Sequence, residues 1–176
     1  MNWIIFLEVL IVVYFIGLWF YMNKKGYKNT TRKLIILFFG VLLFEVMSEP
    51  MWLNLGFHKW AYLYKDITWI ITIGWVNIFM TSFLLVDYHF GHIIEYKRFW
   101  LYLFFVEAIT VPLETLLLQT GIREYAGVLT STMIGKTIPL TIVPIEAIYA
   151  IPLFATLIIC FYKYVNYLFE TGVKND

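Results

Sequence analysis

Residues 34–55 read LIILFFGVLLFEVMSEPMWLNL, a stretch without lysine or arginine that nevertheless contains Glu45 and Glu49. An α-helix needs about 20 predominantly apolar residues to cross the hydrocarbon core of a bilayer, and this stretch has that length. A carboxylate at bilayer depth is costly, so it normally faces the interior of a helical bundle and has a function there. The stretch therefore predicts a membrane-spanning helix with an acidic inner face.

The rest of the chain repeats this composition. Hydrophobic residues make up 61% of the 176 residues and only 14% are charged, which is typical of integral membrane proteins. The apolar runs are continuous rather than alternating, which excludes the strands of a β-barrel. Prolines at 139, 144 and 152 predict an irregular or kinked start for the last run. We therefore expect one all-α transmembrane domain over 1–176, with helices at 3–22, 34–55, 67–87, 99–119 and 138–166.

The charges of the loops predict the orientation of the chain in the membrane. The loop 23–33 holds five lysine or arginine residues and is the most basic connection. Cytoplasmic loops are enriched in these residues, so we expect a multi-pass protein of the cell membrane with its N-terminus outside and its C-terminus in the cytoplasm. The N-terminus lacks the basic region of a signal peptide, which indicates an uncleaved first span. The single cysteine, Cys160, excludes an intrachain disulfide.

Two segments of the chain share a plan. Glu49 is followed by Gly56 at seven positions, and Glu114 is followed by Gly121 at the same spacing. An aromatic residue follows each glutamate at eleven positions, Trp60 in the first segment and Tyr125 in the second. Both segments run helix, outer loop, helix from the same side, as in a parallel transporter-type repeat. This predicts two helix hairpins, units 36–87 and 101–166, in which Asn77 corresponds to Glu146.

Glutamates inside the apolar runs are the main candidate site. Glu45 and Glu49 are four residues apart, and Glu107 and Glu114 are seven apart, so each pair is predicted to share a helix face. No lysine, arginine or histidine lies near them in the spans, which argues against a charge-paired relay. We expect either protonated acids that do acid–base chemistry or a bound cation. The structural alternative is neutral acids that only hydrogen-bond between helices. The full set is Glu8, Glu45, Glu49, Glu107, Glu114 and Glu146.

Other chemistries have little support in the sequence. Asp87, His89, His92 and Glu95 have a spacing that could place metal ligands on one helical face, but they lie at the predicted cytoplasmic boundary. We expect an ordinary interfacial loop there and no metal site. Motifs for nucleotides, flavins and metalloproteases are absent, so we expect no cofactor and no nucleic-acid partner.

The second half of the chain carries a motif of some specificity. An acid on one helix, Glu114, is followed by Gly121 and Tyr125 in the loop and then by Pro144-Ile145-Glu146. In this order the segment resembles the integral-membrane lycopene cyclase domain family, whose signature is Pro-x-Glu-Glu or Pro-x-Glu-Asp. Ala147 stands where that signature has its second acid. The first half matches the family more loosely.

The resemblance implies a reaction without a cofactor on a lipid-soluble isoprenoid that enters from the membrane lipids. A buried acid, Glu146 as the best candidate, would protonate a terminal alkene, and Glu114 or Glu49 would take the proton back. Aromatic faces would stabilise the carbocation, each by about 2 kcal/mol when desolvated. The candidate catalytic residues are Glu146, Glu114, Glu49, Glu45 and Glu107, and the candidate substrate-binding residues are Trp52, Trp75, Asn77, Tyr149, Tyr125 and Trp60.

Two alternatives remain open. The first is a small carrier or channel whose glutamates bind a proton or a cation. The second is a non-catalytic membrane subunit that works with a partner, which the alanine at position 147 leaves open. The sequence does not decide between homo- and hetero-oligomers.

Overall fold

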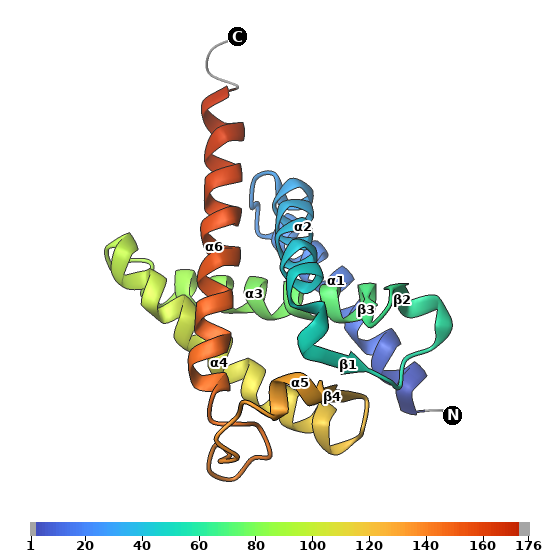
Figure 1. Ribbon diagram of the computed structural model, residues 1–176. Helices are drawn as coiled ribbons and strands as arrows, with labels where there is room; N and C mark the ends of the chain where they lie inside the picture. Colours follow the sequence, from blue (N-terminus) through green and yellow to red (C-terminus); the bar gives the residue numbers. More distant parts are fainter. Residues whose placement is uncertain (1–2, 173–176) are drawn as a thin grey trace.

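The computed structural model describes residues 3–172, which form a bundle of long helices (Figure 1). Five helices in this part of the chain are long and apolar enough to cross a membrane. This confirms the predicted all-α polytopic class and indicates a multi-pass membrane protein. The five are α1 (Trp3–Lys24), α2 (Thr30–Ser48), α3 (Trp69–Phe90), α4 (Glu95–Gln119) and α6 (Ala147–Gly172).

Two of the predicted helices were too long at one end. The second stops at Ser48 and continues as a 3-10 turn, η1 (Glu49–Met51), because Pro50 has no backbone N–H to extend the helix. The fifth begins at Ala147, and residues 138–146 form the irregular segment that the prolines predicted. Glu49 therefore lies in the 3-10 continuation of α2. The placement of Glu146 inside a helix was wrong, since it lies just before the start of α6.

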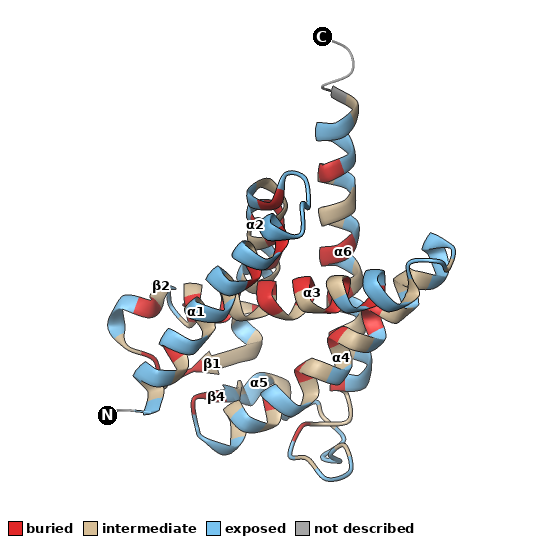
Figure 2. Ribbon diagram, turned by 180° about the vertical axis from the view of Figure 1, so that it is seen from behind, coloured by how far each residue is buried: buried red, intermediate tan, exposed pale blue. Residues whose placement is uncertain are grey.

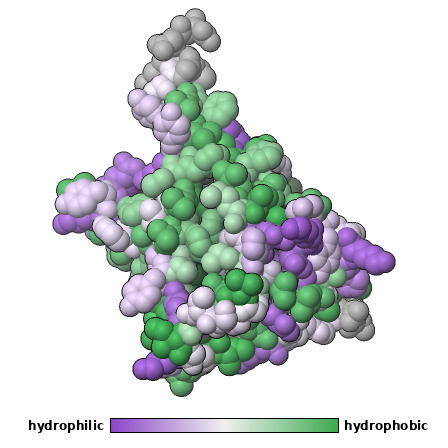
Figure 3. Space-filling model, in the orientation of Figure 1, coloured by the Kyte–Doolittle hydropathy of each residue, from purple (hydrophilic) through white to green (hydrophobic). Residues whose placement is uncertain are grey.

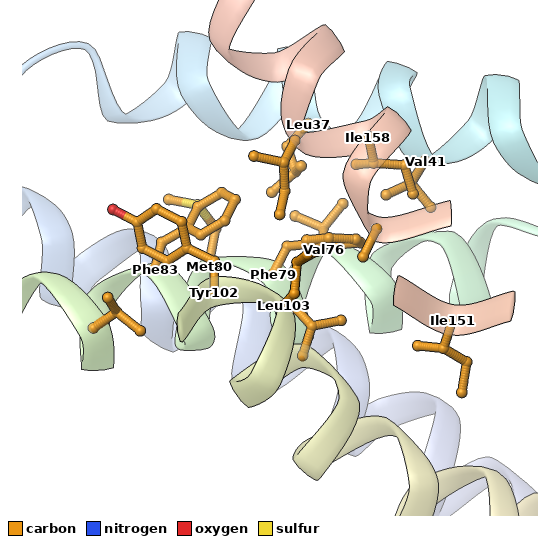
Figure 4. Close-up of a cluster of buried hydrophobic side chains, with 14 of the residues drawn as sticks. Leu37, Val41, Val76, Phe79, Met80, Phe83, Tyr102, Leu103, Ile151 and Ile158 are labelled. Atoms are coloured by element: carbon orange, nitrogen blue, oxygen red, sulfur yellow. The ribbon is translucent and has the colours of Figure 1, made fainter. Parts of the chain in front are cut away.

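Helix α3 is the centre of the bundle and packs against α1, α2 and α4, while α6 packs against α2 and α4. Ten residues of α3 are buried, compared with three of α1. In Figure 2 much of α3 has the colour of buried residues, whereas α1 is mostly coloured as exposed. Helices α2 and α6 approach closely at Gly40, where an added Cβ would lie 2.8 Å from the Phe161 ring. Figure 4 shows the shared core, with labelled side chains Leu37, Val41, Val76, Phe79, Met80, Phe83, Tyr102, Leu103, Ile151 and Ile158.

Short strands connect the segments at one end of the bundle. The prediction that residues 52–54 and 67–68 belong to helices was wrong, since they form strands. Strand β1 (Trp52–Asn54) follows α2, strand β4 (Arg123–Tyr125) follows α4, and the two pair antiparallel. The register places Trp52 opposite Tyr125 and Asn54 opposite Arg123. The remaining elements of this end are η2 (Lys59–Ala61), β2 (Tyr62–Tyr64), β3 (Ile67–Thr68) and α5 (Gly127–Thr130).

The outer surface of the bundle is apolar. On α1, Phe6, Val9 and Val13 are each more than half exposed. Figure 3 shows hydrophobic side chains over the middle of one face, around α6 and α2, with hydrophilic side chains toward its edges. Exposed apolar area of this extent is unfavourable in water, and it suits contact with lipid.

Glu8 has a structural partner that explains its burial in α1. Its carboxylate is fully buried, accepts a hydrogen bond of 2.9 Å from the His58 backbone N–H, and lies 3.1 Å from His58 Nδ1. The contact joins α1 to the connection between α2 and α3. Glu8 therefore stabilises the end of the bundle that carries β1 and β4.

Substituting Glu8 with alanine is expected to lower the free energy of unfolding by about 1–3 kcal/mol, because the partly buried His58 N–H loses its acceptor. Thermal unfolding in detergent measures the change. Glu170→Ala is the matched control, since the Glu170 carboxylate is exposed and lies 3.8 Å from Arg32. An unfolding temperature equal to that of the native chain for Glu8→Ala would contradict the structural role.

Candidate functional site

A buried arginine, Arg123, lies at the centre of the candidate site. Helix α4 ends in a Schellman motif, in which the N–H groups of Gly121 and Ile122 donate to the carbonyls of Leu118 and Leu117, both at 3.2 Å. Gly121 has φ +68°, a conformation that favours glycine. The motif reverses the chain, and the pairing of β4 with β1 holds Arg123 beside the last turns of α4.

Arg123 forms a buried ion pair with Glu114. Its Nε lies 3.3 Å from Glu114 Oε1, and the two side chains are 5% and 7% exposed. The guanidinium also lies over the Trp52 ring, 4.4 Å from the ring centroid, where a cation–π contact is favourable. Neither Arg123 Nε nor Glu114 Oε1 has a hydrogen-bond partner within residues 3–172. Charge attraction and the aromatic face therefore stabilise this arginine, and part of its hydrogen-bonding capacity is unused.

The prediction that the acids lack basic partners was wrong for three of the six glutamates. The partners come from connections that fold back over the helix ends, which spacing along the spans does not reveal. One feature of the sequence could have indicated Arg123 as a partner. It is the first basic residue after a long span, and it follows the turn at Gly121, which returns the chain toward that span. The three pairs are Glu8–His58, Glu49–Lys65 and Glu114–Arg123.

Three cavities meet at Arg123 and Trp75, which line all of them. The largest, the lateral groove, has a volume of about 370 Å³ and lies between α1, α3 and α4. The acid cavity, of about 80 Å³, lies between α4, the start of α6 and the paired strands, and Glu114 and Glu146 line it. The inner cleft, of about 40 Å³, lies between α2, α6 and β1, and Glu45 and Glu49 line it.

The two carboxyl groups of the acid cavity have different surroundings. Glu114 faces Arg123, whereas Glu146 accepts a 2.7 Å hydrogen bond from the Ile134 N–H through Oε1. Glu146 Oε2 is buried and has no hydrogen-bond partner in the described part of the chain. Tyr125 lines the same cavity, and burial, with the negative charge of Glu114 next in size, raises the pKa of its hydroxyl. The phenol therefore remains neutral and can donate or accept a proton through its oxygen.

The inner cleft holds the other pair of glutamates. Glu45 accepts a hydrogen bond from the Thr72 hydroxyl of α3. Glu49 lies 3.3 Å from the Lys65 ammonium, and the hydrogen bond and charge of the carboxylate raise the pKa of that lysine. Since Lys65 is exposed, this pair lies at the edge of the bundle and contributes little stability.

The structure brings most of the predicted site residues together. Three lie elsewhere: Tyr149 is 77% exposed, Trp60 is 54% exposed and packs on Trp69, and Glu107 lines none of the three cavities. Both carboxylate oxygens of Glu107 are buried without a hydrogen-bond partner among residues 3–172. The eight that line the cavities are Glu45, Glu49, Glu114, Glu146, Trp52, Trp75, Tyr125 and Asn77.

The carboxylates near the connection between α3 and α4 are engaged in ion pairs. Asp87 Oδ1 lies 2.9 Å from Arg98 and accepts a 2.6 Å hydrogen bond from the Tyr102 hydroxyl. Glu95 lies 2.6 Å from the Lys163 ammonium on α6. No group of three histidine, cysteine or acidic side chains suited to a metal ion occurs in the described residues. These residues fasten α3 and α6 to α4 at the end of the bundle away from the acid cavity.

No protein-family model, no curated protein and no solved structure matches the chain. The family of the chain therefore stays a prediction, which rests on the motif formed by Glu114, Gly121, Tyr125 and Pro144-Ile145-Glu146. Four members of this motif line the acid cavity: Glu114, Tyr125, Pro144 and Glu146. The functional argument starts from that arrangement.

Replacing Arg123 with methionine is expected to lower the free energy of unfolding by about 3–5 kcal/mol, because Glu114 loses its buried partner. The double variant Arg123→Met with Glu114→Leu is expected to recover much of this loss, since it buries no unpaired charge. Reversible unfolding in mixed detergent micelles measures both.

Arg98→Met is the matched control for the ion-pair variants. It breaks the more exposed pair with Asp87, whose side chains are 24% and 41% exposed, and a loss of at most about 1 kcal/mol is expected. A double variant as unstable as the sum of its two single changes would show that Glu114 and Arg123 do not act as a pair.

Proposed function

We propose that the protein carries out acid–base chemistry on an isoprenoid-type lipid in the acid cavity, with Glu146 as the acid and Glu114 as the base. The observation that supports this most directly is that both carboxyl groups line one cavity in unlike surroundings. Pairs of carboxyl groups in unlike surroundings are a recurrent basis for dividing acid and base roles. The motif that contains both residues resembles the lycopene cyclase domain, which agrees with this chemistry.

The surroundings of each carboxyl group suggest its role. Glu114 forms the negative half of a buried ion pair, as suits a group that receives a proton. Glu146 has no ion pair with a basic residue among the described residues, and its Oε2 is free of hydrogen bonds. Glu146 as a whole is half-buried, but its Oε2 atom is buried. A carboxyl oxygen that is buried and has no basic partner suits proton donation to a bound substrate.

The reaction is an isomerisation. A proton from Glu146 adds to the less substituted carbon of a terminal alkene and leaves a tertiary cation, and the π electrons of a second double bond close the ring on that cation. Glu114 then removes a proton from a neighbouring carbon and restores a double bond. A proton transfer from Glu114 to Glu146 completes the cycle, and the neutral hydroxyl of Tyr125 lines the route between them. No oxidant, reductant or cofactor takes part.

The aromatic residues divide into two roles. Trp75 lines the acid cavity and the lateral groove, so its ring can face a substrate cation. The ring of Trp52 is covered on one face by the Arg123 guanidinium, so Trp52 stabilises the arginine rather than the substrate. Glu107, Tyr149 and Trp60 have no part in this proposal, because they lie outside the cavities.

Incubation of membranes that contain the protein with lycopene or geranylgeraniol in D₂O tests the chemistry. The expected product is a cyclic isomer that carries deuterium, resolved by liquid chromatography and mass spectrometry. Glu146→Gln and Glu114→Gln are each expected to lower its formation at least 100-fold, since general acid and base catalysis contribute factors of about 100 to 10,000.

Glu124→Gln is the matched control for this experiment, because Glu124 follows Arg123 in β4 and its side chain is exposed. It is expected to retain the native rate. Absence of cyclic or deuterated product from both lipids with folded protein would contradict the proposal. A pH-dependent ion flux that requires the same glutamates would favour the carrier alternative instead.

We also propose that the protein resides in the cell membrane with its N-terminus outside and its C-terminus in the cytoplasm. The basic connection between α1 and α2 supports this, since Lys24, Lys25 and Lys28 lie there. The connection that holds α5 lies at the opposite end of the bundle (Figure 1). This orientation would place the paired strands and the acid cavity toward the outer leaflet.

Cysteine labelling in intact cells tests the orientation in a chain with Cys160→Ser. A membrane-impermeant maleimide is expected to label Ser131→Cys, an exposed position after α5, and to leave Lys28→Cys unlabelled until the cells are opened. The reverse pattern would show that the N-terminus lies inside.

A further inference from the structure

The lateral groove has the size and the opening of a lipid-binding site. Its volume of about 370 Å³ falls within the range of about 300–1,000 Å³ that is usual for ligand pockets. Leu10 of α1 and Leu113 and Leu116 of α4 line the groove and are 49%, 43% and 46% exposed. Because these residues belong to the apolar outer surface, the groove opens sideways toward lipid.

Three of the buried polar groups that line this mainly apolar groove have unused hydrogen-bonding capacity, one of them the arginine that is ion-paired with Glu114. Arg123, Thr110 and Asn77 are 4%, 3% and 6% exposed, and all three line it. Arg123 Nε, Thr110 Oγ1 and Asn77 Oδ1 have no hydrogen-bond partner among residues 3–172, although Asn77 Nδ2 donates to the Ile11 carbonyl at 3.0 Å. An unpartnered buried polar atom costs about 1–3 kcal/mol, so three at one groove indicate an occupant that partners them.

The geometry points to a neutral lipid alcohol as this occupant. We propose that the groove binds an isoprenoid chain whose hydroxyl oxygen accepts from Arg123 and Thr110 and whose hydroxyl hydrogen is donated to Asn77 Oδ1. The donors and the acceptor then all have partners. The inference rests on the proposed function, because the groove and the acid cavity share Glu114 and Arg123 in their linings, and it narrows the class of lipid expected to reach the acid cavity.

Charge and polarity distinguish the alcohol from its competitors. A pure hydrocarbon would leave the three polar groups buried and unpartnered. A carboxylate or phosphate would add negative charge beside Glu114, whose charge already neutralises Arg123. A neutral hydroxyl avoids both costs, because it hydrogen-bonds to the polar groups and adds no charge.

Competition binding with matched C20 lipids tests the inference. The full-length protein in lipid nanodiscs is loaded with tritiated phytol, and unlabelled phytol, phytane and phytanic acid compete for the site. Phytol is expected to displace the label at a concentration at least about tenfold below that of phytane and below that of phytanic acid. Equal competition by phytane, or stronger competition by phytanic acid, would overturn the inference.

Variants locate the binding site in the groove. Thr110→Val removes one hydroxyl with little change of shape and is expected to weaken phytol binding about fivefold or more, with phytane binding unchanged. Thr171→Val is the matched control, because Thr171 lies in the last turn of α6 and its hydroxyl bonds to the Tyr167 carbonyl. Equal effects of the two substitutions on phytol would place the site elsewhere and overturn the inference.

The binding assay and the turnover assay test this inference and the catalytic proposal separately. Selective phytol binding without any cyclic or deuterated product would preserve this inference and contradict the catalytic proposal. Cyclic product from lycopene without preference for phytol over phytane would preserve the catalytic proposal and overturn this inference.

Discussion

The buried ion pair between Glu114 and Arg123 is the constraint on which the rest of the site depends. Two charges removed from water are costly, and they stay buried only where the geometry holds them together. Here the turn at Gly121 reverses the chain, and the pairing of β4 with β1 fixes the arginine. Because β1 follows α2 and β4 follows α4, the pairing of these two strands also connects the two halves of the bundle.

The ion pair makes the buried glutamates unequal. Glu114 is matched with a positive charge, Glu45 with a hydroxyl from Thr72, and Glu146 with a backbone N–H and nothing at its second oxygen. A cluster of acids in identical surroundings would suit hydrogen bonding between helices or the binding of a cation. Acids with different partners can serve separately as proton donor and proton acceptor. The acid cavity contains two such acids, Glu114 with a basic partner and Glu146 without one.

The sequence predicted the helices well because the signal is simple. A run of about 20 apolar residues has few structures available to it in a membrane, so the existence of five spans followed directly. The helix ends were less predictable: Pro50 stops α2 before Glu49, and the segment with Pro139 and Pro144 delays the start of α6 until Ala147. Five of the candidate site residues line one cavity: Glu114, Glu146, Trp52, Trp75 and Tyr125.

The partners of the glutamates could not be read from the spans. His58, Lys65 and Arg123 lie in connections, and their positions depend on turns and short strand pairs that span-by-span composition does not encode. Arg123 matters most, because it covers Trp52 and lines all three cavities. Its Nε makes no hydrogen bond among residues 3–172, and the proposal of a lipid alcohol in the groove rests in part on this.

Cysteine cross-linking across β1 and β4 tests most directly whether the two halves assemble the site in this way. Leu53 and Glu124 are register partners, and partners in an antiparallel pair lie about 4.5–5.5 Å apart at Cα, within reach of a disulfide. In a Cys160→Ser chain, Leu53→Cys with Glu124→Cys is predicted to form an intramolecular disulfide on mild oxidation in native membranes. Leu63→Cys with Glu124→Cys is predicted not to, because Leu63 lies on β2, which pairs with β3. Efficient cross-linking of the second pair and none of the first would contradict the account.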